Sequence, residues 1–446
     1  MAAPMTTDRR LATLRRFLEG LAPLLELDLA VRLWDGSTVP LSPRWSGDLA
    51  LAVRAPAAIT RLLRRPKLTT LVELLGDGLL DIEGGTLLDL AARRGTRGTR
   101  GLWKRVGKLQ AARALLPFLL GPITTQSGHA YAGAQVAEAG RGRDDRAQVQ
   151  FHYDLSNEFY ALFLDPEMVY SCAYFPAWQD GIAAAQQAKL EMICRKLRLA
   201  PGERLLDIGC GWGGLVCHAA LHHGVSAHGV TLSQAQHDFA IEKVRRLGLE
   251  GRVTIELRDF RTLTNVEFDK IASIGMFEHV GLANRAGYMQ AIRALLRPRG
   301  LYLHHAITRP MKGSERAFRH KRPEYAAIVD YVFPGTELDH VGGTVDALEA
   351  NGFEVHDVEG WREHYGRTCR LWTERLAANR AAAEAEVGPA KTRLWLLYLA
   401  GVCLGFERGT IGIFQTVASR RARGASGLPP TRGDLYARPP REFGRD

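Results

Sequence analysis

The feature that most constrains the fold is a regular alternation of apolar runs and helical segments that begins near residue 204. Each run is short and rich in Val, Ile and Leu, which is typical of a buried strand, and most are followed by a segment with helical periodicity. The runs occupy 204–210, 226–232, 252–259, 268–275, 300–307, 353–358 and 410–417. This alternation predicts an α/β fold with a doubly wound, mostly parallel, seven-stranded sheet. Ligands of such sheets bind at the carboxyl ends of the strands, so we expect the functional site there.

The 446 residues exceed what one hydrophobic core usually serves, and we expect more than one domain. Residues 1–120 mix helical and strand-like patterns and predict a small α+β domain. Residues 121–146 are rich in Gly, Ala and polar residues, which favours a linker. The sheet domain is expected over 147–420, with a helical cover at about 309–340 and a basic, flexible tail at 421–446.

The net charge of +11 is distributed unevenly. Residues 1–150 carry 22 basic and 14 acidic side chains, whereas 151–418 carry 30 and 31. A stretch from Ala91 to Arg113 holds eight cations and no acid. It is either a solvated face or a surface for an anionic partner, nucleic acid or an anionic lipid membrane. Charge alone does not decide between these readings.

Targeting and redox signals are weak. The N-terminus lacks the apolar core of a signal peptide, and the longest apolar run, 394–406, is too short to span a bilayer and reads as a buried helix. Six cysteines without CxxC or zinc-like Cys/His spacing indicate neither disulfides nor a metal site. We expect a cytoplasmic protein with reduced thiols and no metal.

A glycine-rich turn, LDIGCGWGG at 206–214, follows the first strand of the sheet and opens a helix. Glycines at 209 and 211 allow a sharp turn and a close approach of the backbone to a ligand. The spacing is not that of a dinucleotide-binding turn. It resembles motif I of class I S-adenosylmethionine-dependent methyltransferases.

That resemblance implies a set of cofactor contacts at the ends of the first three strands. Asp259 with Phe260 suits the adenine, and Gln236 replaces the usual ribose-binding acid after the second strand. The implied cofactor-binding residues are Asp207, Gly209, Cys210, Gly211, Trp212, Gly213, Gly214, Thr231, Leu232, Ser233, Gln236, Asp259 and Phe260, and the closer resemblance described next adds Tyr170 and Ser171.

Five further motifs carry a closer resemblance. They are QFHYDLSNEFY at 150–160, MVYSCAYF at 168–175, GVTLS at 229–233, GMFEHVG at 275–281 and HYGRT at 364–368. Together they are similar to the cyclopropane-fatty-acyl-phospholipid synthase family, which includes mycolic acid cyclopropane synthases. The resemblance covers about 150–417, and more weakly the N-terminal domain of the phospholipid-acting branch.

The resemblance implies methyl transfer from S-adenosylmethionine to a cis double bond, followed by proton loss to a bound bicarbonate as a cyclopropane ring closes. The implied bicarbonate ligands are Glu278, His305, Tyr365 and, through backbone groups, Cys172 and Ile307. Cys403 aligns with the cysteine long regarded as the family's active site. The chemical case for Cys403 is weaker, because methylation of an alkene needs no thiolate and no motif nearby supplies a base.

Structural readings compete with several of these roles. His305 could be a core histidine, Glu278 an ordinary cap, and Cys172 and Cys403 simple packing residues. The aromatic residues Phe151, Tyr153, Phe159, Tyr160 and Phe163 either pack in the core or line an acyl tunnel.

The expected function is cyclopropanation of unsaturated phospholipids by an enzyme peripheral on the inner face of the plasma membrane, a possible homodimer. The basic N-terminal domain then docks on anionic lipid. Methyl- or methylene-branching of fatty acids is the alternative within the family. A nucleic-acid methyltransferase is disfavoured because 273–279 reads SIGMFEH where a [DN]-P-P-[YF] element would stand, and no Pro-Cys pair exists. A non-catalytic lipid-binding protein is disfavoured by the intact site residues.

Overall fold

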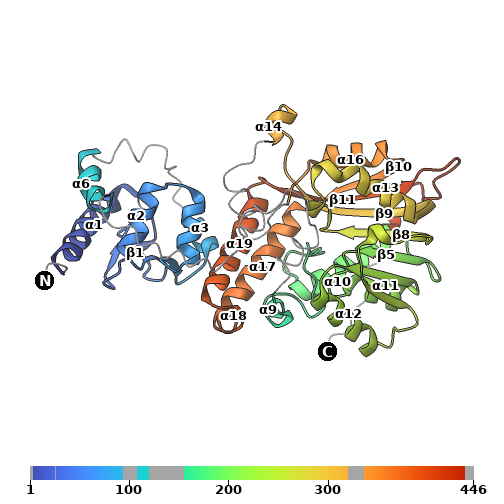
Figure 1. Cartoon of the computed structure of the whole chain (residues 1–446), viewed down its shortest axis with the longest axis horizontal. Helices are drawn as coiled ribbons and strands as arrows, with labels where there is room; N and C mark the ends of the chain where they lie inside the picture. The colour runs from blue at the N-terminus through green and yellow to red at the C-terminus, as the bar shows by residue number, and fades with distance from the viewer. Residues whose placement is uncertain (1–3, 26, 94–107, 120–154, 320–335, 437–446) are drawn as a thin grey trace. The chain divides into compact units, whose positions relative to one another are not determined.

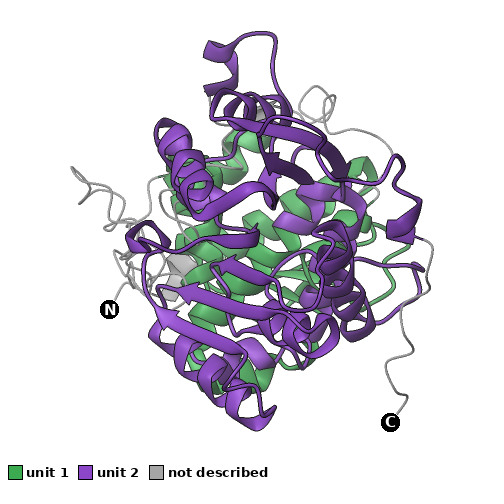
Figure 2. Ribbon diagram, turned by 90° about the vertical axis from the view of Figure 1, so that its right-hand side faces the viewer, with its two compact units in different colours: residues 1–132, 322–328, 376–401 green, residues 133–321, 329–375, 402–446 purple. Residues whose placement is uncertain are grey.

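A computed structural model describes residues 4–25, 27–93, 108–119, 155–319 and 336–436. The chain divides into two compact units (Figure 2). Unit 1 comprises Met1–Ala132, Arg322–Ile328 and Leu376–Gly401, and unit 2 comprises Gly133–Lys321, Val329–Arg375 and Val402–Asp446. Unit 1 therefore contains a late segment, Leu376–Gly401, that we expected within the sheet domain. The expected linker at 121–146 lies outside the described residues.

Unit 1 is built on a four-stranded sheet in the order β2-β1-β3-β4. Its strands are β1 (Ala30–Arg32), β2 (Thr38–Pro40), β3 (Ala50–Val53) and β4 (Leu80–Glu83). Its helices are α1 (Pro4–Leu25), α2 (Pro56–Arg64), α3 (Leu68–Gly76), α4 (Leu87–Ala92), α6 (Lys108–Leu119), α18 (Arg380–Val387) and most of α19 (Pro389–Glu407). A single apolar core joins the sheet to α1, α2, α3, α4, α6 and α19, with Leu49, Leu74 and Phe118 fully buried. The predicted α+β character of this part is confirmed.

Unit 2 contains a seven-stranded sheet in the order β10-β11-β9-β8-β5-β6-β7 (Figure 1). The strands are β5 (Arg204–Ile208), β6 (Ser226–Thr231), β7 (Val253–Leu257), β8 (Phe268–Ile274), β9 (Leu296–Thr308), β10 (Phe353–Gly360) and β11 (Gly412–Arg420). Strands β5 to β9 pair in parallel, and β11 runs antiparallel to both of its neighbours. The predicted seven-stranded, mostly parallel α/β sheet is confirmed.

Helices α10 (Ile182–Lys196), α11 (Gly214–His223) and α12 (Gln234–Arg246) cover one face of this sheet, and α13 (Arg285–Leu295) and α16 (Val341–Ala350) cover the other. Unit 2 also contains α9 (Asn157–Ala161), α14 (Glu315–Arg319), α17 (Arg362–Ala378) and α20 (Gly433–Tyr436), with short 3-10 turns η2 (Phe260–Thr262), η3 (Phe277–His279) and η4 (Leu282–Asn284). Side chains alternate between faces along a strand. Accordingly Leu205 packs in a core with α10 to α12, whereas Leu206 packs in a second core with α13 and α16.

Two expected peripheral segments are described only in part. Of the cover at 309–340, the structure describes α14 and the residues from 336 onward. The tail was expected to be flexible, yet its described part, up to residue 436, packs on unit 2. Leu435 is buried, Arg432 pairs with Asp357, and Arg198 pairs with Asp434.

Candidate functional site

The glycine-rich turn after β5 has the strained backbone that its sequence predicts. Gly209 and Gly211 have φ values of +78° and +54°, in the left-handed region that favours glycine. A Cβ at position 209 would lie 2.3 Å from the sulfur of Met276. The turn therefore requires glycine at 209 for both its conformation and its packing.

This turn forms one wall of a cavity of about 460 Å³ at the carboxyl edge of β5, β6, β7 and β8. Thirteen of the fifteen residues expected to bind cofactor line it: Tyr170, Ser171, Asp207, Gly209, Cys210, Gly211, Trp212, Gly214, Thr231, Leu232, Gln236, Asp259 and Phe260. The volume suits a compact nucleoside ligand. Most of the predicted residues are thus confirmed as lining, but they make up less than half of it: the wall formed by residues from Ile274 to Tyr288 was not predicted.

The two remaining residues, Gly213 and Ser233, are absent from the lining and have structural roles nearby. Gly213 has φ +79° and precedes α11 as its N-cap. The hydroxyl of Ser233 accepts a hydrogen bond from the backbone N–H of Gln236 and caps α12. Both residues shape the loops whose neighbours line the cavity.

Buried charge lies along the β5 side of the cavity. Asp207 is buried, and burial raises the pKa of its carboxyl to about 7. Its Oδ1 has no hydrogen-bond partner in the described part of the chain. Lys189 of α10, also buried, donates to the hydroxyl of Ser171 at 3.0 Å, and burial lowers the pKa of its ammonium to about 8. We did not identify Lys189 from sequence, because a lysine inside a helix usually marks a solvated face.

Gln236 and Asp259, the residues expected to contact the ribose and the adenine, differ in whether their polar groups already have hydrogen-bond partners. The Thr231 hydroxyl donates to Gln236 Oε1 at 2.9 Å, so the amide nitrogen of Gln236 stays available as a donor. The Asp259 carboxylate is held by the guanidinium of Arg261, at 3.0 and 2.6 Å. Arg261 shares the cavity wall, so the contact with adenine expected of Asp259 stays a prediction.

A second group of residues lies beside this cavity and not in its lining. Glu278 is buried in the turn after β8, between Met276 and His279, which do line the cavity. Its Oε1 accepts a 2.7 Å hydrogen bond from the backbone N–H of Ile307, and its Oε2 has no partner among the described residues. Burial raises the pKa of the Glu278 carboxyl to about 7. The Ile307 N–H thus positions Glu278, and the contact with bicarbonate expected of Ile307 stays a prediction.

Trp361 brings three of the other expected catalytic residues together. The ring of His305 lies edge-on to Trp361 with centroids 5.4 Å apart, and the thiol of Cys172 lies 3.9 Å from the Trp361 carbonyl oxygen. Tyr365 follows one turn later in α17, its N–H bonded to the same carbonyl. The His305 Nε2 has no partner within the described residues. Burial raises the pKa values of Cys172 and Tyr365 well above their usual range, so both stay protonated.

Cys403 lies apart from these residues. Its thiol points to the carbonyl oxygen of Gly366 at 3.3 Å and to Glu407 at 3.4 Å. Burial raises its pKa to about 12, so the reactive thiolate is not formed at neutral pH. This environment matches a packing residue.

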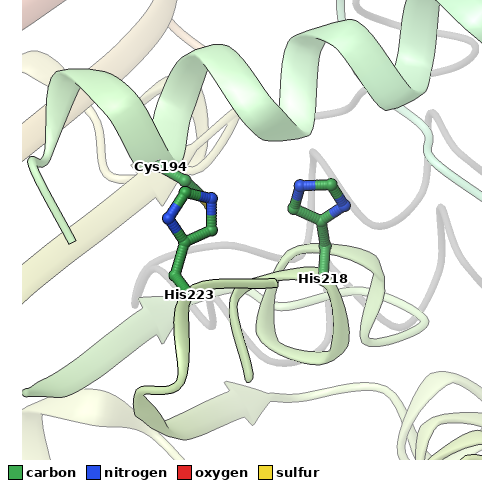
Figure 3. A group of neighbouring side chains, drawn as sticks. All are labelled: Cys194, His218 and His223. Atoms are coloured by element: carbon green, nitrogen blue, oxygen red, sulfur yellow. The ribbon is translucent and has the colours of Figure 1, made fainter. Parts of the chain in front are cut away.

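A further cluster was not foreseen. Cys194, His218 and His223 each place one ligand atom within 4.8 Å of the others (Figure 3). Glu191 explains the grouping of the two rings, because its Oε2 lies 3.4 Å from one imidazole and 3.0 Å from the other. These residues lie in two different helices, α10 and α11, so their spacing in the sequence does not predict the cluster.

The mostly parallel sheet, the glycine turn without a pyrophosphate-binding pattern and the nucleoside-sized cavity define a class I S-adenosylmethionine-dependent methyltransferase. Comparison with known proteins narrows this class. Residues 141–416 match the family model described as mycolic acid cyclopropane synthetase, and the chain belongs to this family.

Three related proteins are each named as enzymes that modify fatty acids or their phospholipids. The chain is 36% identical over 421 residues to a probable fatty acid methyltransferase of Pseudomonas putida, covering 92% of this chain and 97% of that protein. It is 40% identical over 271 residues to the cyclopropane-fatty-acyl-phospholipid synthase of Escherichia coli, covering 60% and 66%. It is also 35% identical over 280 residues to a tuberculostearic acid methyltransferase of Mycobacterium tuberculosis, covering 60% and 64%.

Solved structures support the fold and the cofactor. The cyclopropane synthase MmaA2 of Mycobacterium tuberculosis is 30% identical with a TM-score of 0.58, over 63% of this chain and all of that one. The mycolic acid cyclopropane synthase CmaA1, solved with SAH and CTAB, is 32% identical with the same TM-score and coverage. The bound SAH indicates S-adenosylmethionine as the cofactor here. Among the described helices, none is both long and apolar enough to cross a membrane.

Proposed function

We propose that this enzyme methylates the cis double bond of unsaturated phospholipid acyl chains and closes a cyclopropane ring. The observation that carries the proposal is a pair of buried polar atoms, Glu278 Oε2 and His305 Nε2, without partners among the described residues. Buried polar atoms normally have partners, and exceptions point to a ligand or a catalytic role. Glu278 adjoins the cofactor cavity, and both residues match positions that hold an anion in the family.

Aromatic side chains provide surroundings suited to a carbocation. Tyr170 and Trp212 line the cofactor cavity, and Tyr160 packs against both, with ring centroids 5.5 and 5.0 Å away. Phe163 and Trp372 extend the group on the other side of Tyr170. Aromatic faces attract positive charge and offer no nucleophile that could trap it. Phe159, Tyr160 and Phe163 are fully buried and pack on one another, and Tyr160 and Phe163 contact Tyr170 of the cavity lining. Phe151 and Tyr153 lie outside the described residues.

The residues present fit a bound bicarbonate. Glu278 is readily protonated because its pKa is about 7, and a nearby anion would raise this pKa further. Its Oε2 can then donate to an anion, as can the N–H of His305 and the phenol of Tyr365. Bicarbonate would supply a base for the proton lost from the new methyl group. The protonated thiol of Cys172 is no base, so the side chain itself is not assigned that role.

Methyl- or methylene-branching is the second candidate, supported by the similarity to a tuberculostearic acid methyltransferase. Both outcomes start with methylation of the same double bond. Ring closure and methylene branching both remove a proton from the new methyl group, so they differ in whether a ring forms or a double bond remains.

We also propose that the N-terminal unit docks the enzyme on the inner face of the plasma membrane, and that the enzyme dimerises. Of the basic stretch from Ala91 to Arg113, residues 94–107 lie outside the described part. Arg93 pairs with Asp48 of the same unit at 2.6 Å, whereas Arg113 is exposed. Each cation near an anionic surface contributes about 1 kcal/mol. Binding to anionic vesicles should weaken steeply with salt, and salt-independent binding would refute the docking proposal.

The test of function incubates purified enzyme with methyl-labelled S-adenosylmethionine and vesicles of cis-unsaturated phospholipid. Saturated-chain vesicles and RNA serve as controls. Label should enter only the unsaturated lipid, and mass spectrometry of the released fatty acids should show a product that resists mild hydrogenation, as a cyclopropane does. A product that takes up hydrogen supports methylene branching. Label in RNA, or none in lipid, overturns the proposal.

A further inference from the structure

A chain of buried polar residues links helix α10 to His305. Lys196 at the end of α10, Gln415 in β11 and His305 in β9 are almost completely buried. The Lys196 Nζ lies 2.7 Å from Gln415 Oε1, and Gln415 Nε2 lies 2.9 Å from His305 Nδ1. Strands β11 and β9 pair with Gln415 opposite His305, so the sheet register itself brings the amide to the ring.

The direction of these hydrogen bonds follows from what each group can donate. A lysine ammonium has three donors and no acceptor, so Gln415 must present its carbonyl oxygen to Lys196. Its NH₂ group then faces His305, and Nδ1 must accept. A neutral imidazole carries its single proton on the other nitrogen in that case. Burial lowers the pKa of the Lys196 ammonium, and the ion pair with Glu359 opposes this and favours the charged form on which this order depends.

We propose that Lys196 and Gln415 are positioning residues that fix His305 as the tautomer with its proton on Nε2. His305 then acts as a hydrogen-bond donor toward the anion and not as the base of the reaction. This inference rests on the proposed anion site and adds how that site is organised. The Nδ1 lone pair is occupied and Nε2 carries the proton, so no lone pair of the ring is free to remove a proton from substrate.

The surroundings of His305 keep it neutral. Burial and the positive charges of Lys189 and Lys196 hold the pKa of His305 well below its usual value. A cationic ring would need both nitrogens to donate, and the Gln415 amide N–H at 2.9 Å from Nδ1 opposes this. Over the physiological pH range the His305 ring therefore stays neutral, with Nε2–H as its donor and Nδ1 occupied as an acceptor.

The sharpest test replaces Gln415 by Glu, which keeps the shape and the contact with Lys196 but offers Nδ1 an acceptor in place of a donor. The tautomer should switch to a proton on Nδ1, and Nε2 should become an acceptor. Nitrogen-15 NMR of histidine-labelled protein reads the tautomer directly, with His305→Gln identifying its signals. Wild type should show Nε2–H and Gln415→Glu should show Nδ1–H.

Turnover provides the second readout. In carbonate-depleted buffer with bicarbonate added back, Gln415→Glu should raise the half-saturating bicarbonate concentration or lower kcat by roughly 10- to 100-fold, the value of one hydrogen bond to an anion. Binding of S-adenosylmethionine should be unchanged. Lys196→Met, which buries no new charge, should give mixed tautomers and a smaller loss. Thr416→Val on the same buried strand is the matched control and should behave as wild type.

The outcomes separate this inference from the proposed function. If wild type shows Nδ1–H, or if Gln415→Glu keeps wild-type bicarbonate dependence and kcat, the positioning role is refuted. If wild type shows Nε2–H but needs no bicarbonate, the tautomer assignment is correct. The proposed anion site, and the role of His305 as a donor to it, are then refuted. Should Gln415→Glu fail to fold, the tautomers of Lys196→Met decide: a pure Nε2–H signal would contradict the proposal.

Discussion

The backbone N–H of Ile307 donates a 2.7 Å hydrogen bond to Oε1 of Glu278 and thereby ties the end of β9 to the turn after β8. Only one carboxyl oxygen is engaged, and the second is buried without a partner among the described residues. A residue held only for packing would gain nothing from this arrangement, because an unpaired buried polar atom costs stability. The orientation is explained if Oε2 meets a ligand during turnover.

Glu278→Gln should therefore lose turnover but not cofactor binding. The amide preserves the contact with Ile307 and its NH₂ can still donate to an anion, but it cannot take up or give up a proton as a carboxyl with a pKa of about 7 can. We expect a loss of roughly 10²-fold or more in kcat, typical for removal of one such group. Calorimetry should show S-adenosylmethionine binding within a small factor of wild type. The exposed Glu349→Gln is the control, and full activity of Glu278→Gln would refute the role of Glu278.

The same substitution should change how stability depends on pH. Burial raises the pKa of Glu278 from 4.5 to about 7, so the folded state holds its proton more tightly than the unfolded state. The resulting stabilisation is complete below about pH 4.5 and is lost as pH rises through 7. Between pH 5 and pH 8.5, wild type should lose about 2–3 kcal/mol relative to Glu278→Gln. Urea unfolding without ligands measures this, and parallel curves would contradict it.

Cys403→Ser should retain activity within a few-fold of wild type. The thiol has a pKa of about 12 and touches Gly366 and Glu407, so it is neither a nucleophile nor a base at neutral pH. A serine hydroxyl can make the same two contacts. Steady-state kinetics with lipid vesicles test this expectation, and a loss above roughly 10²-fold with unchanged thermal stability would assign Cys403 a chemical role.

Gly209→Ala should abolish detectable cofactor binding. An alanine there would adopt an unfavourable φ of +78° and would place its Cβ 2.3 Å from the sulfur of Met276. Either the Met276 side chain or the turn must move, and both line the cavity. Gly251→Ala, at a position with open space and ordinary φ, is the matched control. Retained affinity in Gly209→Ala would show that the turn does not contact the cofactor.

The sheet and the cofactor cavity could be predicted because their signals are local. Alternating strands and helices predicted seven strands, and the LDIGCGWGG turn placed its glycines at the strand end. Gly213 and Ser233 show the limit of such reasoning: a motif does not distinguish a residue that touches a ligand from its neighbour that shapes the loop.

The buried polar residues could not be predicted. Lys189 and Lys196 lie in a helix, where lysine usually marks a solvated face, and Gln415 lies in a strand 110 residues after His305. Their roles depend on long-range contacts that only the sheet register creates. The cluster of Glu191 with His218 and His223 was missed for the same reason.

The most direct test of the account uses S-adenosylmethionine with a trideuterated methyl group and vesicles of cis-unsaturated phospholipid. Ring closure removes one deuteron from the new methyl group and consumes the double bond. The account predicts a saturated cyclopropane product that has gained one carbon and retains two deuterium atoms. A product that keeps all three deuterium atoms would show that the proton leaves from elsewhere, and it would contradict cyclopropane formation.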